Sequence, residues 1–141
     1  MIRTIGYEDA AAIVPLMEEL GYPTTKEQMK FRLEGILNRS EYQTFVWEHD
    51  DYLKGMIGMT LSYAYHSDDL HVRVIAFVVK EEYQGEGIGR SLMDAAEKWG
   101  RDKRAKMIML NSGNRDERQT AHQIYRHYGF QGKATGFYKS L

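Results

Sequence analysis

The chain has 141 residues, of which 43% are hydrophobic, and it contains only two prolines. This length and apolar content predict a single domain, residues 1–141, with a sizeable core. The net charge of −1 and the sequence pI of about 6.5 argue against nucleic acid as a partner, because its binding proteins are usually clearly basic. Cysteine is absent, which excludes disulfides, thiolate metal sites and a cysteine nucleophile.

The sequence also bears on where the protein is found. The N-terminal segment lacks the long apolar stretch of a signal peptide, and no apolar run approaches the roughly 18 residues of a membrane span. We therefore expect a cytoplasmic protein without a membrane partner.

The first part of the chain predicts a strand and two helices. Residues 1–5 have the pattern of a short strand, and residues 8–20 that of a helix with one apolar face, ended by Gly21. Thr25 and Gln28 have the spacing of a capping box, which predicts the start of a second helix.

The hydrophobic period then changes to that of strands. Residues 44–48 and 55–65 predict the two strands of a hairpin, with a turn at residues 50–54. Residues 71–79 (HVRVIAFVV) predict the central strand, because seven of the nine are apolar and four are valine. Such a run suits a strand that is covered on both faces.

The last part of the chain alternates helices and strands. Residues 88–103 predict a long amphipathic helix, residues 107–110 a short buried strand and residues 117–128 another helix. A last strand is expected at Phe137 and Tyr138. This order favours an α/β domain of the α+β kind, in which a mixed sheet carries helices on both faces.

A glycine-rich turn connects the predicted central strand to the long helix. Its residues are Gln84, Gly85, Glu86, Gly87, Ile88, Gly89 and Arg90. The first N–H groups of a helix have no partners within it and lie at the positive end of its dipole. Glycines at alternate positions keep side chains away and permit unusual φ angles. The turn therefore predicts a site for a phosphate or pyrophosphate.

Two common phosphate-binding loops do not fit this turn. A Walker-type loop would continue with Gly-Lys-Ser/Thr, which is not found here. A dinucleotide-binding fold would place the turn after the first strand of a βαβ unit, with an acid at the end of the next strand. In this chain the turn lies past the middle, and the next strand ends at Asn111.

The turn resembles the Gln/Arg-x-x-Gly-x-Gly/Ala loop with which the GNAT acetyltransferases hold the pyrophosphate of acetyl-CoA. Residues 121–130 (AHQIYRHYGF) resemble the family's Ala-x-x-Phe-Tyr-x-x-x-Gly-Phe helix end, with Ile124 at the position of the usual Phe. The two motifs stand in the family's order, and the resemblance covers essentially the whole chain. It implies a mostly antiparallel sheet of six to seven strands with splayed central strands and about four helices, and acetyl-CoA as the co-substrate.

The resemblance assigns contacts for acetyl-CoA outside the turn. In this family the strand before the turn pairs with the pantetheine arm, and Phe77, Val78 and Val79 occupy those positions. One of their N–H groups would polarise the thioester carbonyl. Asn114 and Arg118 could contact pantetheine or phosphate, although a solvated loop explains them equally well.

Tyr125 matches the tyrosine that commonly protonates the departing thiolate in this family. A phenol with a pKa of about 10 is a reasonable proton donor to a thiolate. The alternative is an amphipathic tyrosine packed at a helix end. Arg90 likewise has two interpretations: it contacts a phosphate, or it is an ordinary surface arginine. The reaction implied is direct attack of a neutral amine on the acetyl thioester, without a covalent enzyme intermediate.

Three features are similar to small-amine acetyltransferases of the aminoalkylphosphonate type, namely residues 20–23 (LGYP), residues 121–122 (AH) and the tail at residues 137–141. Those enzymes tend to carry carboxylates on the central strand. Arg73 and Ala76 occupy the matching positions here, so neither the general base nor the acceptor follows from the resemblance.

His71 is the remaining candidate for the base, since its unperturbed pKa is near 6.5. For His71, as for His66, Asp68 and Asp69, an exposed turn residue is the favoured alternative. A water chain to bulk solvent could then replace a dedicated base. The spacing His66-x-Asp68-x-x-His71 also invites a metal site, but no convergent third or fourth ligand is evident, so we predict no metal.

Three functions compete at this stage. The first is acetyl transfer to a primary amine of a small molecule. The second is acetylation of a protein at its N-terminus or a lysine, for which an open groove across the sheet would be the distinguishing feature. The third is a non-catalytic module that binds acetyl-CoA. A second copy of the chain is a candidate partner, because the splayed sheet and the C-terminal strands leave edges to cover.

Overall fold

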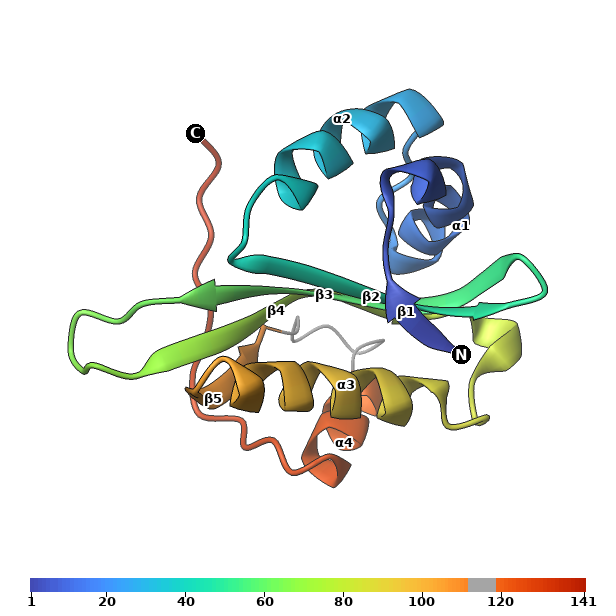
Figure 1. The fold of residues 1–141 in the computed structure, drawn as a ribbon. Helices are drawn as coiled ribbons and strands as arrows, with labels where there is room; N and C mark the ends of the chain where they lie inside the picture. The colour runs from blue at the N-terminus through green and yellow to red at the C-terminus, as the bar shows by residue number, and fades with distance from the viewer. Residues whose placement is uncertain (112–118) are drawn as a thin grey trace.

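The protein is described by a computed structural model that covers residues 1–111 and 119–141 (Figure 1). Its strands are β1 (Ile2–Thr4), β2 (Tyr42–His49), β3 (Tyr52–Ser62), β4 (Leu70–Val79) and β5 (Ala105–Leu110). Its helices are α1 (Ala10–Leu20), α2 (Lys26–Leu37), α3 (Ile88–Asp102) and α4 (Gln119–His127), with short 3-10 turns η1 (Tyr7–Asp9) and η2 (Glu81–Tyr83).

One sheet separates two layers of helices. The strands lie in the order β1-β2-β3-β4-β5, and only the pair β4 and β5, which α3 connects, is parallel. In Figure 1, α1 and α2 lie above the sheet, and α3 and α4 lie below it. The predicted mixed, mostly antiparallel sheet with helices on both faces is therefore confirmed.

The sheet has five strands in the described residues, fewer than the six to seven expected. The predicted last strand at Phe137 and Tyr138 is wrong, because residues 128–141 form no strand and these two side chains are 91% and 80% exposed. Gly132 and Gly136 interrupt this segment, and glycine weakens a strand because it adds entropy to the unfolded chain and packs nothing. The aromatic pair alone does not supply a strand's alternation.

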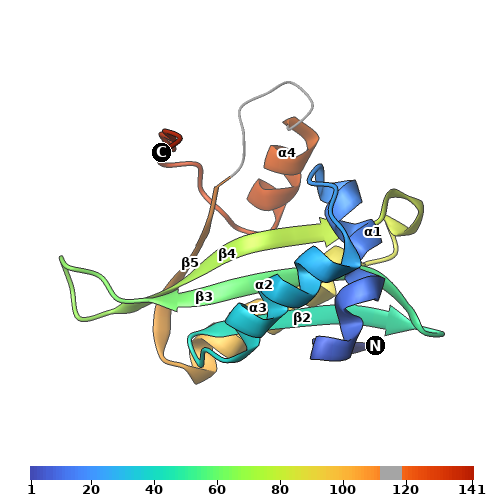
Figure 2. The ribbon, with the colours of Figure 1, turned by 90° about the horizontal axis from the view of Figure 1, so that it is seen from above.

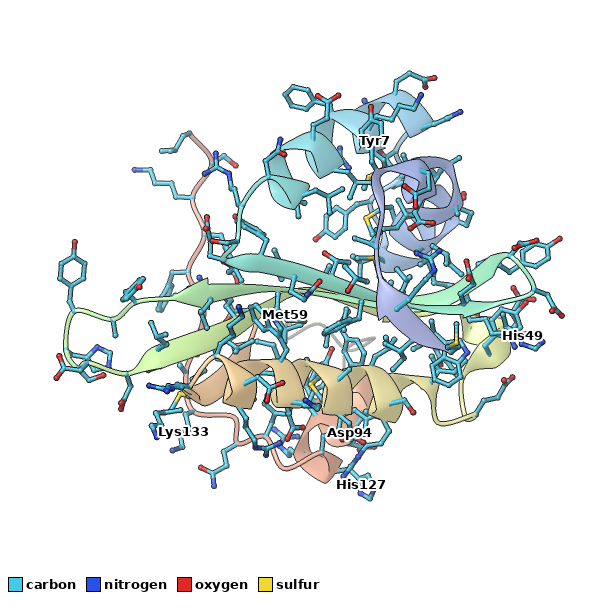
Figure 3. The ribbon with its side chains drawn as sticks, in the orientation of Figure 1. Tyr7, His49, Met59, Asp94, His127 and Lys133 are labelled. Atoms are coloured by element: carbon cyan, nitrogen blue, oxygen red, sulfur yellow. The ribbon has the colours of Figure 1, made fainter. Side chains whose placement is uncertain are left out.

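Each face of the sheet packs its own apolar core. The core under α1 and α2 is built around Ile13, Leu16, Met29, Leu33, Val46 and Val78. The core over α3 is built around Ile57, Met59, Val72, Val74, Leu92 and Met93. Figure 3 shows Met59 on the sheet, above α3, and Asp94 on α3 away from that core. Strand β4, which lies between β3 and β5, contributes to both cores, as its apolar run predicted.

Local signals set the first helices. Gln28 N–H donates to Thr25 Oγ1 at 3.2 Å, and Thr25 N–H donates to Gln28 Oε1 at 3.1 Å, so the predicted capping box is confirmed. Gly21 adopts φ = 100° and ends α1, while Tyr22 N–H donates to the carbonyl of Met17 at 2.9 Å. Within the described ranges, no helix combines the length and apolar character needed to cross a bilayer.

An ion network holds the N-terminal strand and was not foreseen from the sequence. Arg3 forms two hydrogen bonds with the carboxylate of Asp9, at 2.8 and 2.9 Å, and a third with Glu48 at 2.7 Å. Asp9 is only 6% exposed and also accepts from Gly6 N–H at 2.7 Å. These charged hydrogen bonds lower the pKa of the Asp9 carboxyl and join β1 to both η1 and β2.

Candidate active site

A bulge in β4 changes which side chains face which layer. Gly58 pairs with Ala76 and Met59 pairs with Val74, so Ile75 has no partner on β3 and is 50% exposed. Before the bulge, Val74 packs on the core over α3. After it, Phe77 packs on that core, and the side chain of Val78 is buried on the opposite face.

Beyond the bulge, one edge of β4 is open. Pairing with β5 ends at Val74 and Leu110, and no other strand of the described residues pairs with this edge. Figure 2 shows β4 and β5 diverging from this point, which confirms the expected splay. The divergence leaves the C-terminal part of β4 accessible to an extended ligand on the side away from β3.

Ladder geometry shows which backbone groups face the open edge. Lys80 N–H donates to the carbonyl of Lys54 at 2.9 Å, and the groups of an antiparallel strand point alternately toward and away from its partner. Phe77 and Val79 therefore direct their N–H and C=O groups away from β3. Gln84 Nε2 donates to the Val79 carbonyl at 3.2 Å on this side. The backbone groups of Phe77 are thus presented to the open edge.

The glycine-rich turn joins this edge to α3. Gly85 and Gly87 adopt φ angles of 85° and 83°, and a Cβ on either would meet no atom within 4 Å. These two positions therefore need glycine for its backbone conformation and not for space. Ser91 N–H makes the first helical hydrogen bond of α3, to Gly87 at 3.0 Å. The preceding N–H groups, of residues 88–90, are available to an anion at the positive end of the helix.

The turn is anchored from two sides. The Glu19 carboxylate of α1 accepts from Glu81 N–H at 3.0 Å. The Lys54 ammonium of β3 lies 4.3 Å from the centre of the Tyr83 ring and 3.8 Å from the Glu86 carboxylate. Lys54 was expected in a turn. The hairpin turn is shorter than predicted, which places Lys54 inside β3 and beneath the glycine-rich turn.

Tyr125 lies beside the open edge of β4. Its ring centre is 6.3 Å from that of Phe77 and 6.2 Å from that of Phe130. The end of α4 fixes this position, because Phe130 N–H donates to the Tyr125 carbonyl at 3.0 Å and Gly129 adopts φ = 96°. The Gly-Phe pair of the second motif is thus a helix cap, and it places a phenol next to the Phe77 backbone.

Arg90 lies on the first turn of α3 with two side-chain neighbours. Its guanidinium is 5.3 Å from the centre of the Tyr128 ring, and its Nε is 3.4 Å from the Asp94 carboxylate. The pKa of the Tyr128 hydroxyl is raised, mainly by burial. In this arrangement the Arg90 side chain covers Tyr128. The backbone N–H of Arg90 is one of the available N–H groups at the N-terminal end of α3.

His71 and Tyr125 are not brought together. Val72 and Val74 face α3, so His71 and Arg73 point to the other face of the sheet by strand alternation. His71 precedes Phe77 by six positions, a distance of about 20 Å in an extended strand. Its ring centre is 6.0 Å from that of His66, at the tip of the β3–β4 hairpin.

Other predicted contacts lie outside this cluster. Asn114 and Arg118 fall outside the described residues. Ala76 is half-buried on the same face as Arg73, so the central strand has no carboxylate at either position. Within the described residues, no three histidine, aspartate or glutamate side chains converge as metal ligands.

A separate hollow of about 410 Å³ lies between the end of α2 and the start of β2. Thr4, Asn38, Tyr42 and Thr44 are among the residues that line it. It is on the α2 side of the sheet, whereas Tyr125 lies on the α3 and α4 side, so the hollow does not join the cluster around Phe77.

Comparisons with known proteins agree with this geometry. The family model described as the acetyltransferase (GNAT) family matches residues 11–130. A GNAT family acetyltransferase of Staphylococcus aureus subsp. aureus USA300_TCH1516 is 28% identical, with a TM-score of 0.85 and coverage of 100% of this chain and 98% of that one. The chain therefore belongs to the GNAT acetyltransferase family. It is an N-acetyltransferase of a family that uses acetyl-CoA.

Two further structures share the fold at lower identity. Glucosamine-6-phosphate N-acetyltransferase from Arabidopsis thaliana is 15% identical, with a TM-score of 0.85 over 100% of this chain and 97% of that one. AAC(6')-Iy in complex with the bisubstrate analogue CoA-S-monomethyl-acetylneamine is 16% identical, with a TM-score of 0.83 and the same two coverages. No curated protein sequence matches the chain.

Proposed function

We propose that this enzyme transfers the acetyl group of acetyl-CoA to a primary amine of a small molecule. The observation that carries the proposal is the open edge of β4 between the bulge and the glycine-rich turn, with Tyr125 beside Phe77. A small acceptor is supported by two relatives of the same fold, one named for glucosamine-6-phosphate and one bound to an acetylneamine analogue of CoA.

The chain's own groups fit the donor in two places. The available N–H groups at the start of α3 suit a pyrophosphate, and the turn from Gln84 to Arg90 surrounds them. The backbone of Phe77 suits the amide groups of a pantetheine arm, which would add to the sheet as a strand does. The buried side chains of Val78 and Ile88 hold the strand and the helix on either side of the turn.

The chemistry follows from these positions. Acetyl-CoA supplies an activated acyl thioester. In the proposal, the Phe77 N–H donates to the carbonyl oxygen while the amine nitrogen attacks the carbonyl carbon. As the C–N bond forms and the C–S bond breaks, the electron pair leaves on sulfur, and the Tyr125 hydroxyl gives it a proton. Tyr125 then recovers a proton from solvent.

The proton lost by the amine needs its own route. His71 stays the predicted base, but its position at the other end of β4 means that it would act only through intervening water. A water chain to bulk solvent serves the same purpose without a dedicated residue. The two routes differ in their response to a His71→Ala substitution, which abolishes only the first.

A thiol-release assay tests the function. The purified protein is incubated with acetyl-CoA and a panel of aminoalkylphosphonates, polyamines, aminoglycosides, amino acids and short peptides, alongside a thermal-shift titration of acetyl-CoA. We expect stabilisation by acetyl-CoA and thiol release with a small amine. Release with peptides alone would indicate a protein acetyltransferase. Stabilisation without release by any acceptor would indicate a non-catalytic module, and no stabilisation at saturating acetyl-CoA would overturn the proposed site.

A further inference from the structure

Gly89 differs from the other glycines of the turn. The backbones of Gly85 and Gly87 have positive φ angles, whereas that of Gly89 does not. The family's loop pattern also accepts alanine at this position. A Cβ on Gly89 would lie 3.2 Å from the Tyr128 hydroxyl oxygen, closer than ordinary van der Waals contact. Position 89 therefore needs glycine for lack of space, because the Tyr128 hydroxyl lies where a side chain would begin.

Tyr128 is held in this place by its own helix end and by α3. Its N–H donates to the carbonyl of Ile124 at 3.0 Å, which continues the hydrogen bonding of α4. Its ring is half-buried and packs against the core over α3, with the Arg90 guanidinium on one side. Arg90 is in turn paired with Asp94 on the same helix. The contact therefore joins the end of α4 to the first turn of α3.

Phe77 connects this contact to Tyr125. The same Cβ on Gly89 would lie 3.6 Å from Phe77 Cζ, and the Phe77 ring packs on Tyr125. Tyr125 and Tyr128 are three residues apart and so lie on one side of α4. Tyr125 packs on β4 and Tyr128 packs on the first turn of α3, and Phe77 lies next to both contacts.

We propose that Tyr128 is a positioning residue, whose half-buried ring docks α4 on the first turn of α3 in the space that the missing side chain of Gly89 leaves open. The contact couples the turn that would bind the pyrophosphate to the helix that carries Tyr125. This coupling to acetyl-CoA rests on the proposed function, whereas the match between Gly89 and Tyr128 can be measured without a ligand.

A double-substitution cycle tests the pair. The proteins are the wild type, Gly89→Ala, Tyr128→Phe and the double variant, each measured for its melting temperature without ligand and for acetyl-CoA affinity by calorimetry. Gly35→Ala is the matched glycine control, because a Cβ there meets no atom within 4 Å. Tyr52→Phe is the tyrosine control, because that side chain is exposed on β3.

We expect Gly89→Ala alone to lower the melting temperature and to weaken acetyl-CoA binding by roughly threefold or more, as is usual for coupled neighbours. Tyr128→Phe removes the hydroxyl that the methyl meets, so the double variant should recover most of both losses. Neither control should reproduce the effect. Additive losses in the double variant would overturn the proposal.

The two hypotheses fail differently. A wild type that does not bind acetyl-CoA would overturn the proposed function, while the melting temperatures of the cycle would still decide the Gly89–Tyr128 pair. A further variant, Tyr128→Leu, separates positioning from catalysis. It should raise KM for acetyl-CoA at least as strongly as it lowers kcat, whereas Tyr128→Phe in the native Gly89 background should change neither by more than about twofold. A loss confined to kcat in both variants would overturn the positioning role.

Discussion

The ring of Tyr125 lies 6.3 Å from the ring of Phe77, the residue whose backbone groups face the open edge of the sheet. The two residues are far apart in sequence, on α4 and β4, and Figure 2 shows α4 beside the part of β4 from which β5 has diverged. In the proposed aminolysis, the phenol would protonate the leaving thiolate and the backbone groups of Phe77 would polarise the thioester carbonyl.

Tyr125→Phe tests the proton donor. The substitution keeps the ring packed on Phe77 and Phe130 but removes the hydroxyl. We expect kcat to fall by about 100-fold, in the range usual for loss of a general acid, with little change in KM for acetyl-CoA. Steady-state kinetics of thiol release check this, with Tyr52→Phe as the control. Unchanged kcat would mean that the leaving thiolate takes its proton from water.

The conformation of the turn predicts a difference between two substitutions at one position. At Gly87, φ is 83° and a Cβ would clash with nothing. Alanine should therefore lower the stability only through the strain of the left-handed backbone, about 1–2 kcal/mol. Asparagine tolerates this region better, so Gly87→Asn should lose less stability than Gly87→Ala. Urea unfolding curves compare the two. Equal losses would mean that contacts of the side chain, and not φ, decide the position.

The Arg3–Asp9 pair predicts how stability depends on pH. The Asp9 pKa is lowered in the folded protein, chiefly by its hydrogen bonds with Arg3, so the stabilisation is present above the unfolded pKa of about 3.9 and is lost as pH falls through the lower folded pKa. Asp9→Ala should lower the free energy of unfolding by about 2 kcal/mol at pH 7, as expected for lost hydrogen bonds between charged groups. The free energy of unfolding of the variant should also fall less steeply below pH 4. Urea titrations at pH 3, 4, 5 and 7 measure both. If the variant loses stability below pH 4 as steeply as the wild type, the acid sensitivity comes from other carboxylates.

Local patterns in the sequence predicted most of the fold. The capping box at Thr25, the apolar run of β4 and the glycines after it each depend on near neighbours in the chain. The bulge at Ile75 could not be predicted in the same way, because it is defined by the register between β3 and β4. The Arg3–Asp9–Glu48 network likewise needs β1 to lie beside β2, which local patterns do not specify.

The residues of the candidate site likewise include some that local motifs predicted and some that only the tertiary structure shows. The motifs predicted Tyr125 and the turn, since their residue types and spacing recur in the GNAT acetyltransferases. Lys54 lies outside both motifs and Tyr128 occupies an unspecified position of the second, so only their tertiary contacts show that they support the turn. The hairpin turn at residues 50–51 explains the error for Lys54. Two consecutive aspartates with φ of 49° and 66° close it in fewer residues than expected, and aspartate tolerates this region.

Lys54 predicts a charge effect on the donor site. Its side chain is only 17% exposed and holds its ammonium near Tyr83 and Glu86, at the base of the turn. Lys54→Met keeps much of the apolar stem but removes the charge, so the turn loses a cation–π contact of about 0.5–1 kcal/mol and the anion site loses a nearby positive charge.

We expect Lys54→Met to raise the dissociation constant of acetyl-CoA by roughly threefold to tenfold and to make binding less sensitive to salt, because one screened attraction is gone. Calorimetric titrations at low and high ionic strength measure both quantities. Lys106→Met, on the exposed surface of β5, is the matched control and should leave them near the wild-type values. If the two variants weaken binding equally, the effect comes from the protein's net charge, and Lys54 has no special place beneath the turn.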